Sequence, residues 1–464
     1  MAPETYRSVL EGLYARRRFG LRPGLEVVRA LLAELGDPQR TFPAVHITGS
    51  KGKGSVAALT AAALEAHGLS VGLFTSPHLA HYAERMRIDG RPIAPAAVVA
   101  GVERVERAAT TLRARGTIDR DPTFFEVTTA VAFDWFARRK IDAGVIEVGV
   151  GGRLDSTNVL DARVGVVTTI ELEHTELLGS TLAAIAGEKS GIFHPGMHAV
   201  VGELPPEAAE VVLRTADRLG LPVWRLGREI ELGERTLAAD GQTVVLRLPG
   251  VALPPIELPL LGRFQAGNAA LAVAAAVRFL TATGRPVRPE AIAEGIARVK
   301  WPGRLERRAR RPELYYDVAH TPESARAVAE SLGEIAPLAD PTESAIVFGC
   351  LRGKNVGGIL DALAPLARTL VVVPVKSERR IPPAELRVAA TGLFPRVVEA
   401  PNAADGLRLA RAATGPAGCT LVTGSDYLIG ELLRPVDSDE PDLSDPGTEP
   451  TAAGRTLASS GRAA

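Results

Sequence analysis

Residues 46–68 read HITGSKGKGSVAALTAAALEAHG, so an apolar strand, a glycine-rich loop and an alanine-rich helix follow one another directly. At such a junction, successive backbone N–H groups and the helix dipole form a cradle for an anion. The usual phosphate-loop pattern, G-x-x-x-x-G-K-[ST], has its first glycine six residues before the lysine. Here Ile47 stands at that position, and the first glycine of the loop, Gly49, lies only four residues before Lys53. The stretch therefore predicts a phosphate-binding loop of a shortened form.

Each residue type in this loop is suited to holding a phosphate. Gly49, Gly52 and Gly54 permit close approach of the backbone and positive φ angles. Lys53 supplies charge that offsets the phosphate, and the Ser55 hydroxyl can contact phosphate or Mg²⁺. The alternative is a glycine-rich connector that carries a lysine by chance. The strand–loop–helix context favours phosphate binding over that alternative.

Composition indicates a soluble globular protein with two or three domains. The chain has 464 residues, of which 46% are hydrophobic and 23% are charged. Lysine plus arginine and aspartate plus glutamate both number 54, so no basic field favours nucleic acid or an anionic membrane as a partner. The two cysteines, Cys350 and Cys419, argue against a disulfide framework. With no apolar segment typical of a signal peptide or of a bilayer span, we expect a cytoplasmic protein.

The order of apolar segments predicts an α/β fold with two domains. From about residue 42, short apolar strands alternate with helices, which predicts a P-loop-type, doubly wound parallel sheet within residues 1–300. Asp240-Gly241 indicates a hairpin. After a break at Trp301–Arg304, a second alternating series predicts a smaller Rossmann-like domain over residues 301–434, with LYYDVAH as its first strand. Residues 435–464, rich in Pro, Ser, Gly and acids, are predicted to be a disordered tail.

Several longer motifs carry a family resemblance. They include HITGSKGKGS, GLFTSPHL, EVGVGGRLDSTNV, HTELLGSTLAAIAGEKSGI, LGRFQAGNAALA, WPGRLE, YYDVAHTPES and VTGSDYL. In this order they resemble the folylpolyglutamate synthase/dihydrofolate synthase family, the folate members of the ATP-dependent Mur ligase superfamily, as far as about Leu433. The resemblance implies a monomeric enzyme that uses ATP and Mg²⁺ to add L-glutamate to a pteroate or folate through an acyl phosphate. It also accounts for the short loop, since the superfamily has G-T-N-G-K-[GST]-[ST] there.

The resemblance also implies a set of site residues. Nucleotide contacts are expected at Gly49, Ser50, Lys51, Gly52, Lys53, Gly54, Ser55, Gln265, Asn268, Arg304, Asp317 and His320. Metal contacts are expected at Ser55, Ser76, Glu147, His174 and Lys189, the last as a CO₂-derived carbamate. Catalytic roles are expected for Lys53, His174, Lys189 and Arg304. Taken singly, Ser76, Glu147 and His174 would more often be structural, and a helical lysine such as Lys189 is usually solvated. Their joint order after the glycine loop favours function.

The chain departs from the family pattern at Ser50, Lys51, Glu173, Phe264, Val318 and Thr321. Four of them, Lys51, Phe264, Val318 and Thr321, support one alternative, a nucleotide-binding regulator that no longer ligates. The retained residues weigh against it: Lys53, Glu147, His174, Lys189, Arg304 and Asp317. A second alternative is a cell-wall peptide ligase of the same superfamily. Those ligases have a separate substrate domain before the loop, and the 48 residues that precede Gly49 are too few for one.

Overall fold

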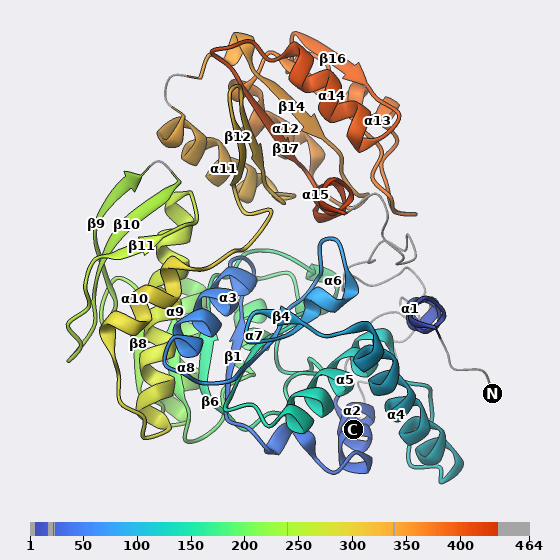
Figure 1. The fold of residues 1–464 in the computed structure, drawn as a ribbon, viewed down its shortest axis with the longest axis vertical. Helices are drawn as coiled ribbons and strands as arrows, with labels where there is room; N and C mark the ends of the chain where they lie inside the picture. The colour runs from blue at the N-terminus through green and yellow to red at the C-terminus, as the bar shows by residue number, and fades with distance from the viewer. Residues whose placement is uncertain (1–4, 17–21, 23, 239, 337–338, 435–464) are drawn as a thin grey trace.

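The computed structural model describes residues 5–16, 22, 24–238, 240–336 and 339–434, whose strands form three β-sheets. Figure 1 shows a larger lower part, coloured blue to yellow, and a smaller orange-to-red part above it. The large eight-stranded sheet lies in the lower part and a six-stranded sheet lies in the upper part. A three-stranded sheet stands at one side, between the two. The predicted tail at residues 435–464 lies outside the described residues.

The large sheet is parallel apart from one edge. Its strand order is β4-β3-β2-β5-β1-β6-β7-β8, and only the β2–β3 and β3–β4 pairings are antiparallel. The glycine loop leaves β1, which lies in the middle of the sheet between β5 and β6. The strands are β1 (Ala44–Thr48), β2 (Val71–Phe74), β3 (Met86–Ile88), β4 (Arg91–Pro92), β5 (Ala143–Glu147), β6 (Ala162–Val167), β7 (His198–Val201) and β8 (Val223–Arg225).

Helices cover both faces of this sheet, which explains why its strands appear in the sequence as nearly continuous apolar runs. In β1, Ala44 packs into the cluster that contains α1, α2, α4, α5, α7 and α8, whereas Val45 and Ile47 pack into the cluster that contains α3, α9 and α10. The helices are α1 (Tyr6–Ala15), α2 (Glu26–Glu34), α3 (Lys53–Glu65), α4 (Pro95–Ala114), α5 (Phe124–Arg139), α6 (Thr175–Leu178), α7 (Leu182–Ser190), α8 (Pro206–Arg218), α9 (Arg263–Ala282) and α10 (Pro289–Ala297), with 3₁₀ turns η2 (Pro38–Arg40) and η3 (Tyr82–Arg85).

Helix α9 is long and apolar enough, by length and composition, to cross a membrane. However, 72% of its most apolar window is buried inside the protein. It packs along α3 against the large sheet, so its apolar character is that of a core helix.

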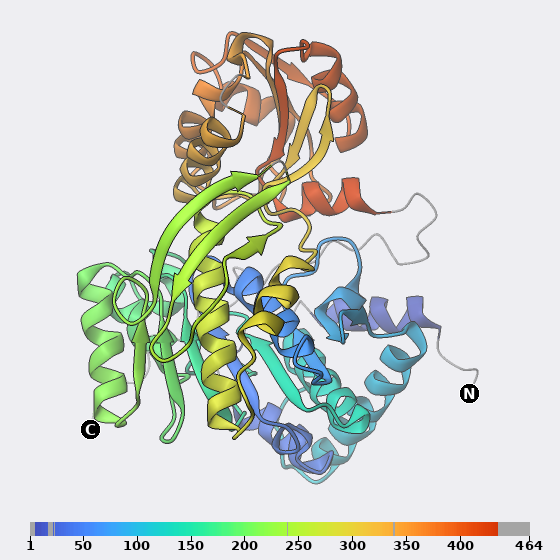
Figure 2. The ribbon, with the colours of Figure 1, turned by 60° about the vertical axis from the view of Figure 1, so that its left-hand side comes forward.

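The three-stranded sheet contains β9 (Glu231–Ala238), β10 (Gly241–Arg247) and β11 (Ile256–Leu258). β9 and β10 are antiparallel, with Gly241 opposite Ala238. The hairpin predicted from Asp240-Gly241 is therefore confirmed. In Figure 2 this hairpin rises from the lower part and reaches the underside of the upper part.

The second large sheet has the order β12-β13-β17-β14-β15-β16. Helices α11, α12 and α13 cover one face, and α14 and α15 cover the other. The elements are β12 (Glu306–Arg310), β13 (Glu313–Tyr316), α11 (Pro322–Ile335), η4 (Pro341–Glu343), β14 (Ala345–Phe348), α12 (Val356–Leu363), η5 (Ala364–Leu366), β15 (Thr369–Val372), α13 (Pro383–Ala389), β16 (Arg396–Glu399), α14 (Ala403–Ala413), β17 (Cys419–Thr423) and α15 (Asp426–Leu433).

One sequence prediction about this sheet is wrong. LYYDVAH is not its first strand, because β12 precedes β13 and pairs with it antiparallel. The β12 sequence, ERRAR, is dominated by charge because the strand lies at the sheet edge, where none of its residues is fully buried. For that reason it lacks the apolar pattern by which the other strands can be found.

Candidate nucleotide site

Most of the predicted site residues meet in one cavity of about 580 Å³ between the two large sheets. The lower part contributes the loops that follow β1, β2, β5 and β6, and the upper part contributes those that follow β13, β14 and β17. The predicted residues that line it are Ser50, Lys51, Gly52, Lys53, Gly54, Ser55, Ser76, Glu147, His174, Gln265, Asn268, Arg304, Asp317 and His320. Gly49 and Lys189 are bonded to residues of this wall rather than lining it themselves.

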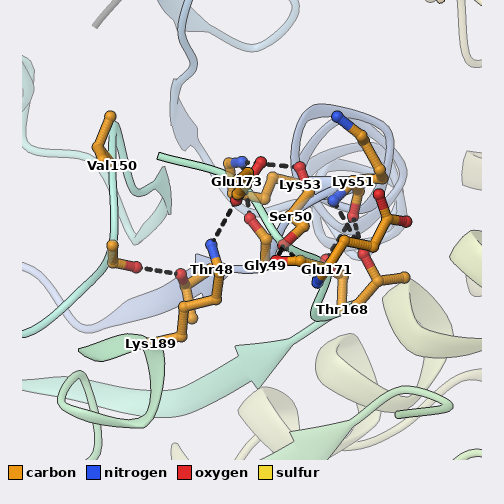
Figure 3. A network of polar contacts seen from close by, with 12 residues as sticks. Thr48, Gly49, Ser50, Lys51, Lys53, Val150, Thr168, Glu171, Glu173 and Lys189 are labelled. Carbon is orange, nitrogen blue, oxygen red and sulfur yellow. Dashed lines mark hydrogen bonds and ion pairs between the residues drawn. The ribbon is translucent and has the colours of Figure 1, made fainter. Parts of the chain in front are cut away.

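The glycine loop is fixed by two threonines that directly follow β6, Thr168, which is labelled in Figure 3, and Thr169. The Ser50 N–H donates to the Thr169 carbonyl at 2.8 Å, and the Lys51 N–H donates to the Thr169 hydroxyl at 2.9 Å. The Thr168 hydroxyl donates to the Lys51 carbonyl at 2.5 Å. These bonds hold the loop in one conformation against the neighbouring strand. A loop that is fixed in this way presents its remaining N–H groups to a ligand without reorganisation.

Glycine is required at two positions of this loop. Gly49 and Gly52 have φ angles of 147° and 83°. A Cβ on Gly49 would lie 1.8 Å from the Thr168 hydroxyl oxygen, and one on Gly52 would lie 2.4 Å from the Asn268 Oδ1. Both the backbone conformation and the close packing therefore exclude larger residues.

Lys53 begins α3 and its side chain folds back over the loop. Its Nζ donates to the Gly49 carbonyl at 2.8 Å and lies 3.4 Å from the Ser50 carbonyl. The ammonium therefore stands at the mouth of the loop and at the positive end of the helix dipole. Anionic oxygens would be attracted to this position.

Glu147 places a buried carboxylate behind the loop. Its Oε2 accepts a hydrogen bond from the Ser76 N–H at 2.9 Å, and burial raises its pKa, although the Lys53 ammonium opposes that rise. Both carboxylate oxygens lie 3.6 Å from the position of a Cβ on Gly54, next to Ser55 at the start of α3. A cation beside the loop would lower the cost of burying this charge.

The donor set fits Mg²⁺. Within the described ranges, no three His, Cys, Asp or Glu side chains lie close enough together to hold a metal. Mg²⁺ is usually held by one or two protein carboxylates together with waters and phosphate oxygens. Glu147, with the hydroxyls of Ser55 and Ser76, matches that pattern, and His174 lies on the same cavity wall. His174 precedes α6 in a left-handed conformation, with φ of 46°.

Lys189 is a buried residue of α7 and not a solvated one. It is 1% exposed, and its Nζ lies 2.8 Å from the Glu173 carboxylate (Figure 3). Burial lowers the pKa of Lys189 to about 8, although Glu173 opposes that shift. Burial alone would raise the pKa of Glu173, but the neighbouring ammoniums of Lys189, Lys53 and Lys51 hold it well below its usual range. The pair therefore lies in a cluster of cations that surrounds the loop.

Asp317 is the buried acid of the upper part of the cavity. Its two carboxylate oxygens accept hydrogen bonds from the Leu305 and Ala319 N–H groups, both at 2.7 Å. Burial raises its pKa to about 6, with the Arg304 guanidinium opposing the rise. His320 follows on the same loop, and its Nδ1 lies 2.9 Å from the Val318 carbonyl oxygen.

Gln265 and Asn268 lie on one face of α9, as predicted from their spacing. The Asn268 side-chain amide donates to the Gln265 side-chain oxygen at 2.9 Å. Because Asn268 also packs against Gly52, the start of α9 is in direct contact with the glycine loop.

Several residues of this site were not predicted from the sequence, among them two threonines, two acids and a lysine. Thr168 and Thr169 hold the loop, and Glu171, Lys354 and Asp426 line the cavity. Thr168 and Thr169 follow β6, Lys354 follows β14 and Asp426 follows β17. Ligands of α/β folds bind at the carboxyl ends of the strands, so polar residues just after each apolar strand were the available signal.

The fold is that of the Mur ligases. Residues 47–276 match the family model of the Mur ligase middle domain, and residues 303–426 match that of the Mur ligase glutamate ligase domain. A dihydrofolate synthase/folylpolyglutamate synthase of Mycobacterium tuberculosis is 38% identical over 402 residues, which cover 84% of this chain and 82% of the relative. One of Bacillus subtilis is 31% identical over 92% of this chain and 98% of the relative. The chain belongs to the folylpolyglutamate synthase/dihydrofolate synthase family of ATP-dependent ligases.

Solved structures agree with this assignment. The folylpolyglutamate synthase of Mycobacterium tuberculosis in complex with ADP superposes with a TM-score of 0.85 at 35% identity, over 92% of this chain and 97% of that one. A folylpolyglutamate synthase complex with AMPPCP and folate superposes with a TM-score of 0.79 at 32% identity, over 92% and 98% of the two chains.

Proposed function

We propose that this ligase adds L-glutamate to dihydropteroate, to a tetrahydrofolate, or to both, and that it converts ATP to ADP and phosphate. The main support is the cavity of about 580 Å³ that is lined both by the glycine loop of the lower part and by Asp317 and His320 of the upper part. The relatives bound to ADP, AMPPCP and folate support the same substrate classes.

We infer that the reaction proceeds through an acyl phosphate. A carboxylate oxygen of the folate substrate attacks the γ-phosphorus and ADP leaves. The glutamate amine then attacks the acyl carbon and phosphate leaves. Lys53 and the loop N–H groups would stabilise the charge on the phosphate oxygens, which is worth most in a site that excludes water. Glu147, Ser55 and Ser76 would hold Mg²⁺, which would supply further charge stabilisation.

The two parts of the chain would have separate tasks. Residues 1–300 would hold the phosphates through Gly49–Ser55, and residues 301–434 would approach the nucleoside through Asp317 and His320. Arg304, at the junction, would clamp the phosphates once the parts are correctly placed. We propose a cytoplasmic monomer whose partners are small molecules only.

The deciding experiment is an assay of glutamate-dependent phosphate release with dihydropteroate or tetrahydrofolate as acceptor. Turnover with either acceptor supports the proposal and also tells which of the two the enzyme uses. ATP binding without turnover on either acceptor would contradict it and favour a nucleotide-binding regulator. Turnover only with a UDP-sugar peptide would favour a cell-wall ligase instead.

A further inference from the structure

The β9–β10 hairpin carries a group of polar side chains that the proposed reaction does not use. Gln242 is 2% exposed, and its side-chain amide donates to the Leu260 carbonyl at 2.7 Å and to the Gly262 carbonyl at 2.9 Å. These two carbonyls belong to the turn that leads into α9. The hairpin therefore holds the beginning of the helix that carries Gln265 and Asn268 to the glycine loop.

Arg235 extends this contact to the upper part of the chain. One guanidinium nitrogen donates to the Gln242 side-chain oxygen at 3.0 Å, and another is bonded to the Glu334 carboxylate of α11. The Arg235 side chain is only 14% exposed. Glu334 also accepts a hydrogen bond from Arg263, at the first residue of α9, at 2.7 Å. Arg235 thus joins the hairpin directly to α11, and it reaches the α9 turn through Gln242.

The same turn is inserted into the apolar core of the upper part. Leu261 is 4% exposed and belongs to the cluster formed by α11, α12 and β13, and Phe264 packs against that cluster. A Cβ on Gly262 would lie 3.2 Å from the Ser331 hydroxyl of α11. The start of α9 therefore contacts the glycine loop on one side and α11 on the other, so its position sets the distance between the two cavity walls.

A second contact lies at the hairpin tip. Asp240 pairs with Arg310 at 2.5 Å and with Arg307 at 3.5 Å, both on β12. Figure 2 shows the hairpin bridging the lower and upper parts at this side.

We propose that Arg235 is a positioning residue, which holds the upper part over the glycine loop through Gln242 on one side and Glu334 on the other. Without it, the upper part would occupy a wider range of orientations, and only a fraction of molecules would present both walls of the cavity to ATP. The apparent affinity for ATP falls in proportion to the fraction of molecules in which both cavity walls are in place. The turnover rate at saturating ATP is retained, because bound ATP restores that arrangement.

The test compares Arg235→Ala, Arg235→Lys, Glu334→Ala and the Arg235→Ala/Glu334→Ala double variant in the full-length protein. Arg235→Ala should weaken binding of the non-hydrolysable analogue AMPPCP about threefold to tenfold, the scale of a partly exposed ion pair plus one hydrogen bond. It should raise KM for ATP similarly and leave kcat near that of the wild type. Arg235→Lys should recover part of the affinity, because lysine keeps the charge but lacks the planar fork that reaches two partners. Glu334→Ala should reduce the affinity for AMPPCP less in the Arg235→Ala background than in the wild type.

Arg104→Ala is the matched control. Arg104 forms an ion pair with Asp134 between α4 and α5, which pack on the opposite face of the large sheet from the hairpin. This variant should lower the melting temperature without changing AMPPCP affinity. Unchanged affinity in Arg235→Ala would overturn the proposal, and so would an equal loss of affinity in Arg104→Ala.

The positioning role rests on the proposed function, because it assumes that ATP fills the cavity. If the wild type binds no AMPPCP, the proposed function fails, and small-angle scattering of the unliganded proteins still tests the role of Arg235. A broader distance distribution for Arg235→Ala than for the wild type and Arg104→Ala would support it. Identical distributions would overturn it.

Discussion

At the scale of single residues, burial shifts the pKa values of Lys189 and Asp317 away from those of lysine and aspartate in water. Lys189 has a pKa of about 8, so a useful fraction of it is the neutral amine at moderately alkaline pH. Only the neutral amine can add to CO₂. The charges of Lys51 and Lys53 also act at this position and would offset part of the charge of a carbamate. The Glu173 carboxylate, 2.8 Å from the Nζ, would have to release the amine before the carbamate suggested by the family resemblance could form.

We predict that Lys189 takes up one CO₂. Intact-protein mass, or ¹³C NMR with labelled bicarbonate, should show one adduct in the wild type and none in Lys189→Ala. Lys189→Ala should have reduced ligase activity, partly restored by short carboxylic acids that occupy the vacated space. Lys300→Ala, which removes an exposed lysine, is the control and should keep both the adduct and the activity. A wild-type protein that stays unmodified at saturating bicarbonate would contradict the prediction.

Asp317 predicts a pH dependence of stability. Its folded pKa of about 6 lies above its ordinary value of 3.8, so the folded state binds the proton more tightly than the unfolded state does. Stability contributed by the protonated form is therefore present below about pH 4 and is lost as the pH rises through 6. For a pKa shift of this size, the free energy of unfolding falls by an amount on the order of 3 kcal/mol.

Asp317→Asn should remove this dependence. The Asn side chain has one acceptor oxygen, so only one of the Leu305 and Ala319 N–H groups keeps its hydrogen bond. The variant should therefore be less stable than the wild type at pH 4. The difference in unfolding free energy between wild type and variant should then shrink as the pH is raised from 4 to 7. Urea titrations at several pH values measure it, and a difference that does not vary with pH would contradict the assignment.

At the scale of elements, the glycine loop of the strand–loop–helix unit β1–α3 contacts the residues after β6 on one side and α9 on the other. Thr168 and Thr169 hold the loop from β6, and Asn268 approaches it from α9. A Cβ on Gly52 would lie 2.4 Å from the Asn268 Oδ1, so the Asn268 side chain, which lines the nucleotide cavity, would have to move.

Gly52→Ala should therefore weaken ATP binding at least about tenfold, since a misplaced contact at a preorganised site is costly. Gly68→Ala is a closely matched control. Gly68 has φ of 82°, close to the 83° of Gly52, but a Cβ on it would meet no atom within 4 Å. Both variants should lose similar stability from backbone strain, and only Gly52→Ala should lose affinity in calorimetry. Equal affinity in the two variants would show that the contact with Asn268 is unimportant.

Which elements could be predicted from sequence depended on where they lie. The buried strand β1 is apolar because both faces of its sheet are covered, and the sequence predicts it as the strand before the glycine loop. The edge strand β12 was missed because exposure removes the apolar pattern. At the site, the glycine loop and the acids were recognisable by residue type. The roles of Thr168 and Thr169 were not, because they depend on β6 lying beside β1, and single-strand patterns do not give strand order.

At the scale of the whole molecule, the cavity exists only where the two parts of the chain meet. Arg304 lies in the segment that joins them, between α10 and β12, and its charge acts on both Glu147 in the lower part and Asp317 in the upper part. It is therefore placed to link nucleotide binding with the arrangement of the two parts.

Arg304→Ala should fold normally and lose most ligase activity. In the wild type, ATP should narrow the distance distribution from small-angle scattering, because one ATP molecule then contacts both parts of the chain. In Arg304→Ala, ATP should narrow this distribution less. Circular dichroism checks the fold of the variant. Scattering that ATP leaves unchanged in the wild type, together with full ATP affinity in the isolated segment 1–300, would contradict a shared site.

The order of strands in the two sheets has a consequence for synthesis of the chain. β1 emerges early but lies between β5 and β6, and β17, the last strand, lies between β13 and β14. A nascent chain can therefore complete neither sheet in the order in which its strands leave the ribosome, and such non-local pairing forms slowly. The nucleotide cavity can close only after translation has passed Thr423. A prematurely terminated product would thus present an open glycine loop but no closed site in which to retain ATP.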